Sequence, residues 1–272
     1  MLTANHLVAN HLVANHLVAN HLVANRLVST RLTDHRLTAN MRSAGSMLQT
    51  EDGREVFAFL VSCALPADIT VVAEVDDQTF EFGGDVGLAP EWIVGPLGRE
   101  GQGWVSACLF SRVSAREISV PISERGPTYQ LRTDSDEREN WSVEEGAFFG
   151  NFFGNPDQPI QWFACRGAGQ AAGEAGGLVG RDCTEPDPAN PGLTKCGFNF
   201  AGDCGSFSED QACESFSEHG LFYRRCHTQP LDTDHHHHHG RAGDLFDGLN
   251  NHGHGHDRDR VFEQVITTYV TP

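Results

Sequence analysis

The chain has 272 residues, of which 39% are hydrophobic and 9% aromatic, enough apolar material for one domain with extensions. Its formal net charge of −18 is unevenly placed. Four arginines against one aspartate give residues 1–50 a charge of +3, which leaves −21 for the remainder. Because a body this acidic repels phosphate backbones, the composition argues against nucleic-acid binding and favours a solvated acidic surface or a basic partner.

Residues 2–41 form an internal repeat with a period of five, in which the unit LVANH recurs. A step of five turns an α-helix by about 140°, so the leucines make no helical stripe. On a strand, an odd period puts successive leucines on opposite faces. We therefore expect residues 1–46 to form a repeat arm that is either extended or solenoid-like. An extended arm would suit strand addition to the sheet edge of a neighbouring molecule.

The repeat array resembles the pentapeptide-repeat pattern, which implies a square solenoid with leucine pointing inward. It departs from that pattern because Asn5, Asn10 and Asn15 stand where a small residue is usual. Eight repeats would also make only two coils of a solenoid, which need a cap to be stable.

Residues 50–272 are predicted to form a single α+β domain, because segments with helical spacing and segments with strict alternation both occur. The expected helices run from Asp52 to just before Pro66, over Trp104–Val113 and over Glu144–Phe153, which carries four phenylalanines. The expected strands are Ile69–Val75, a hairpin partner around Phe80 and Phe82, Ile118–Ile122, Ile160–Cys165 and Val261–Val270. The pattern predicts an antiparallel sheet with two or three helices.

Eight cysteines are present, and six of them lie in residues 165–226, which are rich in glycine, proline and aspartate. A segment with so little core-forming pattern needs cross-links, so we expect disulfides that staple a loop-rich C-terminal half. Zinc is the rival explanation, but no CxxC spacing is present. The cysteines expected in disulfides are Cys63, Cys108, Cys165, Cys183, Cys196, Cys204, Cys213 and Cys226.

The cysteine content favours an oxidising compartment, so we expect an extracellular, periplasmic or cell-surface protein. No apolar run reaches about 18 residues, which predicts no transmembrane segment. The first residues lack the basic and apolar regions of a signal peptide. Export would then require a start upstream, earlier processing or another route.

An acidic insertion over residues 232–260 is rich in histidine, with aspartates interleaved. Imidazole binds zinc, copper or nickel, and a loop can bring several histidines together. Because a low-complexity loop supplies few fixed partners for the ligands, we expect no resident cofactor, only a weakly bound divalent metal such as zinc. The candidate ligands are His235, His236, His237, His238, His239, His252, His254 and His256.

Cys108 has two interpretations. With Gln102 six residues before it, the segment resembles the active-site region of papain-like cysteine proteases, which implies Cys108 as nucleophile, Gln102 as oxyanion donor and His219 as base. The chain departs from that family, since residues 105–109 read VSACL and no Asn-Ser-Trp motif follows His219. Alternatively, Cys63 and Cys108 pair with each other, because both lie outside the C-terminal cysteine cluster on apolar helical segments.

The repeat arm, the motifs VSCALP, GLAPEW, WVSACL, EGAFFGN and VITTYV, and the cysteine-rich region together resemble a family of uncharacterised bacterial exported proteins. The resemblance implies export and the domain limits. The leading hypothesis is an exported or cell-surface structural or interaction protein without enzymatic activity. It would assemble through its arm with itself or with another surface protein. The alternatives are a secreted thiol hydrolase and a divalent-metal-binding module.

Overall fold

The computed structural model describes residues 8–9, 12–13, 48–114, 120–153, 161–169, 183–205, 212–215, 221–227 and 261–272. Within these ranges the fold is α+β, with three α-helices and both mixed and antiparallel sheets. The predicted α+β class is therefore confirmed. Most of the predicted repeat arm lies outside the described residues. In the part that is described, no helix has the length and apolar character that crossing a bilayer requires.

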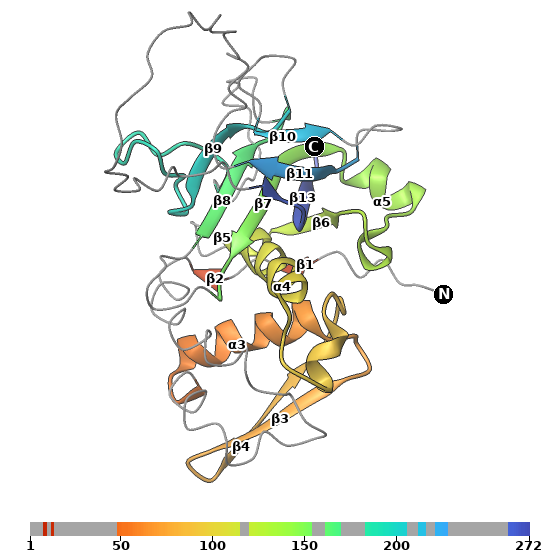
Figure 1. The fold of residues 1–272 in the computed structure, drawn as a ribbon, viewed down its shortest axis with the longest axis vertical. Coiled ribbons are helices and arrows are strands. Elements are labelled where there is room, and N and C mark those ends of the chain that lie inside the picture. The colour runs from red at the N-terminus through yellow and green to blue at the C-terminus, as the bar shows by residue number, and fades with distance from the viewer. Residues whose placement is uncertain are drawn as a thin grey trace, which may run out of the picture.

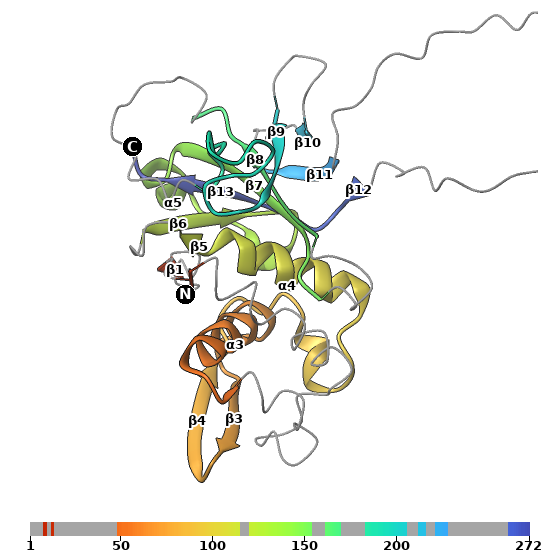
Figure 2. The same ribbon diagram turned by 90° about the vertical axis from the view of Figure 1, so that its left-hand side faces the viewer.

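The elements stack in layers (Figure 1). Helix α4 (Arg99–Ser111) packs against one face of the six-stranded main sheet, and α3 (Glu51–Ala64) packs on α4. The hairpin of β3 (Thr70–Val75) and β4 (Gln78–Gly83) packs on α3, farthest from the sheet (Figure 2). On the other face of the main sheet lies a small sheet of three short strands.

The main sheet places the last strand of the chain at its centre. All neighbouring strands are antiparallel except β8 and β9, which are parallel. The predicted strand Val261–Val270 divides in two, and its second part pairs on both sides. In sheet order the strands are β1 (Val8–Ala9), β6 (Pro121–Arg125), β13 (Val265–Val270), β7 (Val143–Asn151), β8 (Gln161–Arg166) and β9 (Asn199–Asp203).

The remaining elements are short. The small sheet has the order β10 (Cys213–Ser215), β11 (Tyr223–His227) and β12 (Val261–Phe262). β2 (Leu12–Val13) pairs in parallel with β5 (Val113–Ser114). Two 3₁₀ turns and one short helix complete the described part: η1 (Pro90–Ile93), η2 (Tyr129–Leu131) and α5 (Ser135–Asn140).

Local sequence explains the first helix and the hairpin. Thr50 caps α3, because its Oγ1 accepts a hydrogen bond from the N–H of Gly53 at 3.1 Å, so the helix begins one residue before the predicted Asp52. The β3–β4 hairpin turns through Asp76 and Asp77, whose φ angles of 49° and 63° are those of a two-residue type I′ turn, which matches the right-handed twist of the flanking strands. The predicted hairpin is therefore confirmed.

The predicted helix over Glu144–Phe153 is wrong, because β7 occupies this segment. Phe148 packs toward the helices and Phe149 toward the small sheet, so adjacent residues point to opposite faces. A strand buried on both faces is continuously apolar, and this resembles a buried helix. At Gly150, φ is 139° and a Cβ would lie 2.0 Å from the carbonyl oxygen of Gln161, so the neighbouring strand requires glycine there.

A buried ion pair joins the helices to the main sheet. Arg112 follows α4, and its Nε and Nη2 donate to the two carboxylate oxygens of Glu124 in β6 at 3.2 and 3.1 Å. Both side chains are fully buried. Nη1 donates to Ser62 Oγ of α3 at 2.8 Å, and Ser111 Oγ donates to Glu124. Because buried charges are tolerated only when paired and hydrogen-bonded, this network fixes how α3, α4 and β6 lie together.

Replacement of Glu124 by glutamine is expected to lower the free energy of unfolding by about 3 kcal/mol, because it leaves the buried Arg112 charge without its main counter-ion. Chemical denaturation measures this loss. The matched control is Glu214→Gln, which removes the partner of an exposed ion pair. Nε of Arg225 lies 2.8 Å from Oε2 of Glu214, and the side chains of Glu214 and Arg225 are 41% and 50% exposed. The control should lose less than about 1 kcal/mol. Equal losses in the two variants would contradict the structural role of the buried pair.

Candidate functional site

The residues predicted for a thiol hydrolase are not assembled in the described part of the chain. Cys108 of α4 is bonded to Cys63 of α3, and both are fully buried, so Cys108 carries no thiol. Gln102 is held elsewhere, because its Nε2 donates to the Leu97 carbonyl at 3.0 Å and its Oε1 accepts from Asn151 Nδ2 at 3.3 Å. His219 lies outside the described residues. The arrangement favours a scaffold role for Cys108.

The predicted metal ligands also lie outside the described residues. This applies to the five consecutive histidines 235–239 and to those at 252, 254 and 256, so weak binding of a divalent metal stays a prediction.

All eight cysteines are in disulfides. The six in the C-terminal region pair as Cys165–Cys204, Cys183–Cys196 and Cys213–Cys226.

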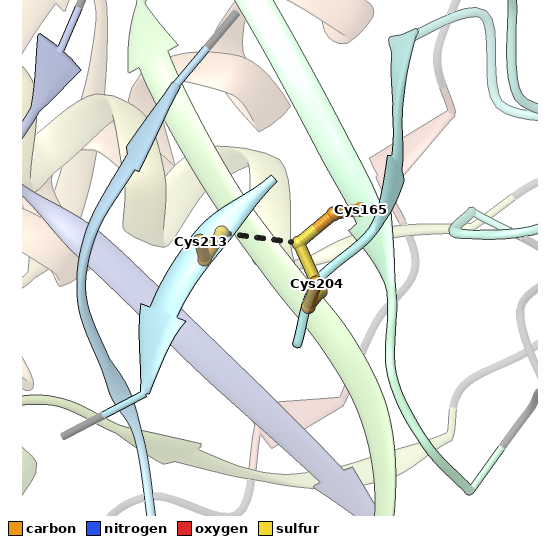
Figure 3. Close-up of side chains that lie close together, drawn as sticks. All are labelled: Cys165, Cys204 and Cys213. Carbon is orange, nitrogen blue, oxygen red and sulfur yellow. Dashed lines mark hydrogen bonds between the residues drawn. A yellow bond between two sulfur atoms is a disulfide. The ribbon is translucent and has the colours of Figure 1, made fainter. Parts of the chain in front are cut away.

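Two of these disulfides contact each other, and Figure 3 shows the Cys165–Cys204 disulfide beside Cys213 of the other. The sulfur of Cys213 in β10 lies 3.3 Å from the sulfur of Cys165 in β8. The sulfurs of Cys165, Cys204 and Cys213 all lie within 4.8 Å of one another, and all three residues are buried. This is the one group of potential metal ligands found among the described residues. Each of its sulfurs is already bonded to another sulfur, so we assign it to disulfide chemistry.

A cluster of polar side chains lies where β6, β7, β11 and β13 meet. The hydroxyl of Tyr223 donates to Glu144 Oε1 at 2.7 Å. The guanidinium carbon of Arg125 lies 3.7 Å from the ring centroid of Tyr269, a cation–π contact, and Nη2 of Arg125 donates to the Trp141 carbonyl at 2.5 Å. We call Arg125, Glu144, Tyr223 and Tyr269 the tyrosine cluster.

Burial dominates the proton equilibria of the tyrosine cluster. It raises the pKa of Tyr269 to about 12, with a further contribution from the charge of Glu144. Burial and then the Glu144 charge raise the pKa of Tyr223, and burial raises the pKa of Glu144 itself. Burial also lowers the pKa of Arg125. Because both tyrosines hold their protons at neutral pH, Tyr223 acts as a fixed hydrogen-bond donor to Glu144 and not as a proton shuttle.

Sequence reasoning missed the tyrosine cluster. Its members come from four strands far apart in the chain, and no motif links them. The single available signal was the β-branched terminal segment VITTYV, which contains Tyr269. The sequence pattern predicts a helix that begins at Glu144, whereas in the structure this residue lies in β7 and accepts a hydrogen bond from Tyr223.

The described residues of the repeat arm lie against the body as short strands. β1 pairs antiparallel with residues 121–122 of β6, at the edge of the main sheet, and β2 pairs parallel with β5. On its other side β6 pairs with β13 through residues 123–125. Among the described residues, the arm and the body therefore meet at β5 and at the β6 edge of the main sheet.

The tyrosine cluster predicts a loss of stability at high pH. In the unfolded chain Tyr269 ionises near 10.0, whereas in the folded protein its pKa is about 12, so the unfolded state releases its proton first. The free energy of unfolding should fall as the pH rises through this window. Chemical unfolding at a series of pH values should show a smaller fall for Tyr269→Phe. It should show an unchanged fall for Tyr129→Phe, which alters a tyrosine that is 62% exposed. Identical slopes in the two variants would contradict this assignment.

Comparison of the chain with protein-family models, with curated proteins and with solved structures gives no match. A functional proposal for the chain must therefore rest on its own side chains and strand edges.

Proposed function

We propose that this chain is an exported interaction protein without enzymatic activity, which assembles by adding strands of its repeat arm to the edge of its main sheet. The observation that carries the proposal is the pairing of β1, from the repeat arm, with β6 of the body. Strand addition at a sheet edge is a common mode of recognition, because main-chain hydrogen bonds supply the affinity. The partner that fits this mode best is a second copy of the chain.

The sequence of the arm supports exchange between copies. The segment Leu-Val-Ala-Asn occurs four times, beginning at residues 7, 12, 17 and 22. β1 uses the first of these segments, and β2 uses the second. Since main-chain pairing depends little on which copy is used, the other two offer the same strand to the β6 edge of a neighbour, in place of that neighbour's own β1. One arm therefore has more binding segments than its own body needs.

Charge supports the same contact. Residues 1–50 carry +3 and the rest of the chain −21, so the arm is attracted to the body of its own molecule or of another. Attraction between exposed charges weakens with salt, since screening acts over about 10 Å at 0.1 M. Assembly through the arm should therefore weaken as the ionic strength rises.

Disulfide content supports export. All eight cysteines are paired, which is compatible with an extracellular or periplasmic protein. The Cys63–Cys108 disulfide also counts against the thiol-hydrolase alternative, because a nucleophile needs a free thiolate.

Deletion of residues 1–45 is expected to convert assemblies of two or more chains into single chains, as measured by light scattering coupled to size-exclusion chromatography. The mass of one full chain is 29.7 kDa. The control replaces the arm with a shuffled sequence of the same composition, which keeps its charge but breaks the Leu-Val-Ala-Asn segments. The shuffled chain should also be monomeric. Assembly of the shuffled chain would assign the contact to charge alone, and assembly after deletion would exclude the arm.

A further inference from the structure

Main-chain hydrogen bonds hold the two contacting disulfides in place. The N–H of Cys213 donates to the carbonyl of Cys204 at 2.8 Å, and the N–H of Cys204 donates to the carbonyl of Arg166 at 2.8 Å. Arg166 directly follows Cys165 in β8. Cys213 and Cys226 lie directly opposite each other on β10 and β11. The short approach of the Cys165 and Cys213 sulfurs is therefore imposed by the backbone of adjoining strands.

We propose that these four cysteines form a thiol–disulfide exchange centre that captures a small external thiol. The external thiolate attacks the sulfur of Cys226, forms a mixed disulfide with it and breaks the bond to Cys213. The Cys213 thiolate then attacks the sulfur of Cys165, forms a Cys165–Cys213 bond and breaks the bond to Cys204. Cys204 leaves as a thiolate and takes up the proton that the external thiol released. One thiol is bound, and there is no net oxidation or reduction.

Geometry favours the second step. The sulfurs of Cys213 and Cys165 are 3.3 Å apart before any bond opens, so the distance is already that of reacting atoms, about 3–3.5 Å, and only the alignment with the bond that breaks has still to be reached. Opening the bond to Cys226 frees rotation of the Cys213 side chain, which lets its thiolate align with the Cys165–Cys204 bond. An internal thiolate at this distance reacts far faster than one supplied from solution.

The position of the centre favours the first step. Cys213 and Cys226 belong to the small sheet, whose strands have three, five and two residues. Sheets this short open locally at a low free-energy cost, which exposes Cys226 to a thiol from solvent. Arg225, next to Cys226, has a side chain that is already 50% exposed.

The variant Cys226→Ser tests the second step directly, because it leaves Cys213 as a free thiol beside the Cys165–Cys204 bond. The folded full chain is treated with N-ethylmaleimide, digested with pepsin at acid pH without reduction, and mapped by mass spectrometry. We expect a Cys165–Cys213 peptide with maleimide on Cys204. Maleimide on Cys213 alone, with Cys165–Cys204 intact, would overturn the proposal.

The matched control is Cys196→Ser. It opens the Cys183–Cys196 disulfide, which has the same sequence separation of 13 as Cys213–Cys226. The sulfur of Cys183 contacts the Val113 carbonyl at 3.1 Å, and Cys183 is not part of the three-sulfur group. We expect maleimide on Cys183 and no rearranged disulfide. Rearrangement to the same extent in this control would show non-specific scrambling and overturn the proposal.

The unmodified chain gives a second measurement, which needs no variant to fold. After incubation with reduced glutathione and maleimide trapping, we expect glutathione on Cys226 and maleimide on Cys204. Glutathione on Cys226 with maleimide on Cys213 would show that the internal attack does not occur. A Cys213–Cys226 disulfide that stays intact in excess glutathione would overturn the capture of an external thiol.

Discussion

Arg112 lies between two helices and the main sheet, and its guanidinium donates to Glu124 and Ser62 without contact with solvent. Removing two charges from water is costly unless geometry and hydrogen bonds compensate, and the observed arrangement of α3, α4 and β6 supplies both. The Cys63–Cys108 disulfide joins the same two helices beside it, since Cys63 follows Ser62 in the chain and Cys108 lies one turn before Arg112. A covalent bond and an ionic contact thus fix one crossing point, on which the layer order depends.

The two faces of the main sheet are stabilised differently. The helical face buries large apolar side chains, among them Phe57, Trp92 and Phe110, which are fully buried. The other face carries the small sheet, where a group that includes Cys165, Cys213 and smaller side chains packs on Phe149 and Val265. Short strands bury too little apolar area to hold a sheet by themselves, so cross-links replace core volume on this face. The tyrosine cluster adds hydrogen bonds and a cation–π contact to the same side.

The local sequence pattern predicted those elements whose conformation depends little on neighbouring elements. It failed where contacts with neighbouring elements determine the conformation. The β3–β4 hairpin and the buried face of α3 follow from alternation and helical spacing. The start of α4 was placed too late, at Trp104 in place of Arg99, because glycine weakens a helix prediction. Gly103 nevertheless packs closely, since a Cβ there would lie 2.8 Å from the side chain of Gln264, which would have to shift. The disulfide partners among the six C-terminal cysteines were equally inaccessible, because six cysteines allow 15 pairings.

The central position of β13 constrains the order in which the arm can dock. β6 pairs with β13 on one side and with β1 on the other, so the strand that receives the arm is held in the sheet by the final strand of the chain. Contacts this distant in sequence form late, because the loop-closure entropy must be overcome first. The edge that receives β1 is therefore complete only when β13 is in place beside β6. Assembly through the arm at this edge is therefore coupled to a finished sheet.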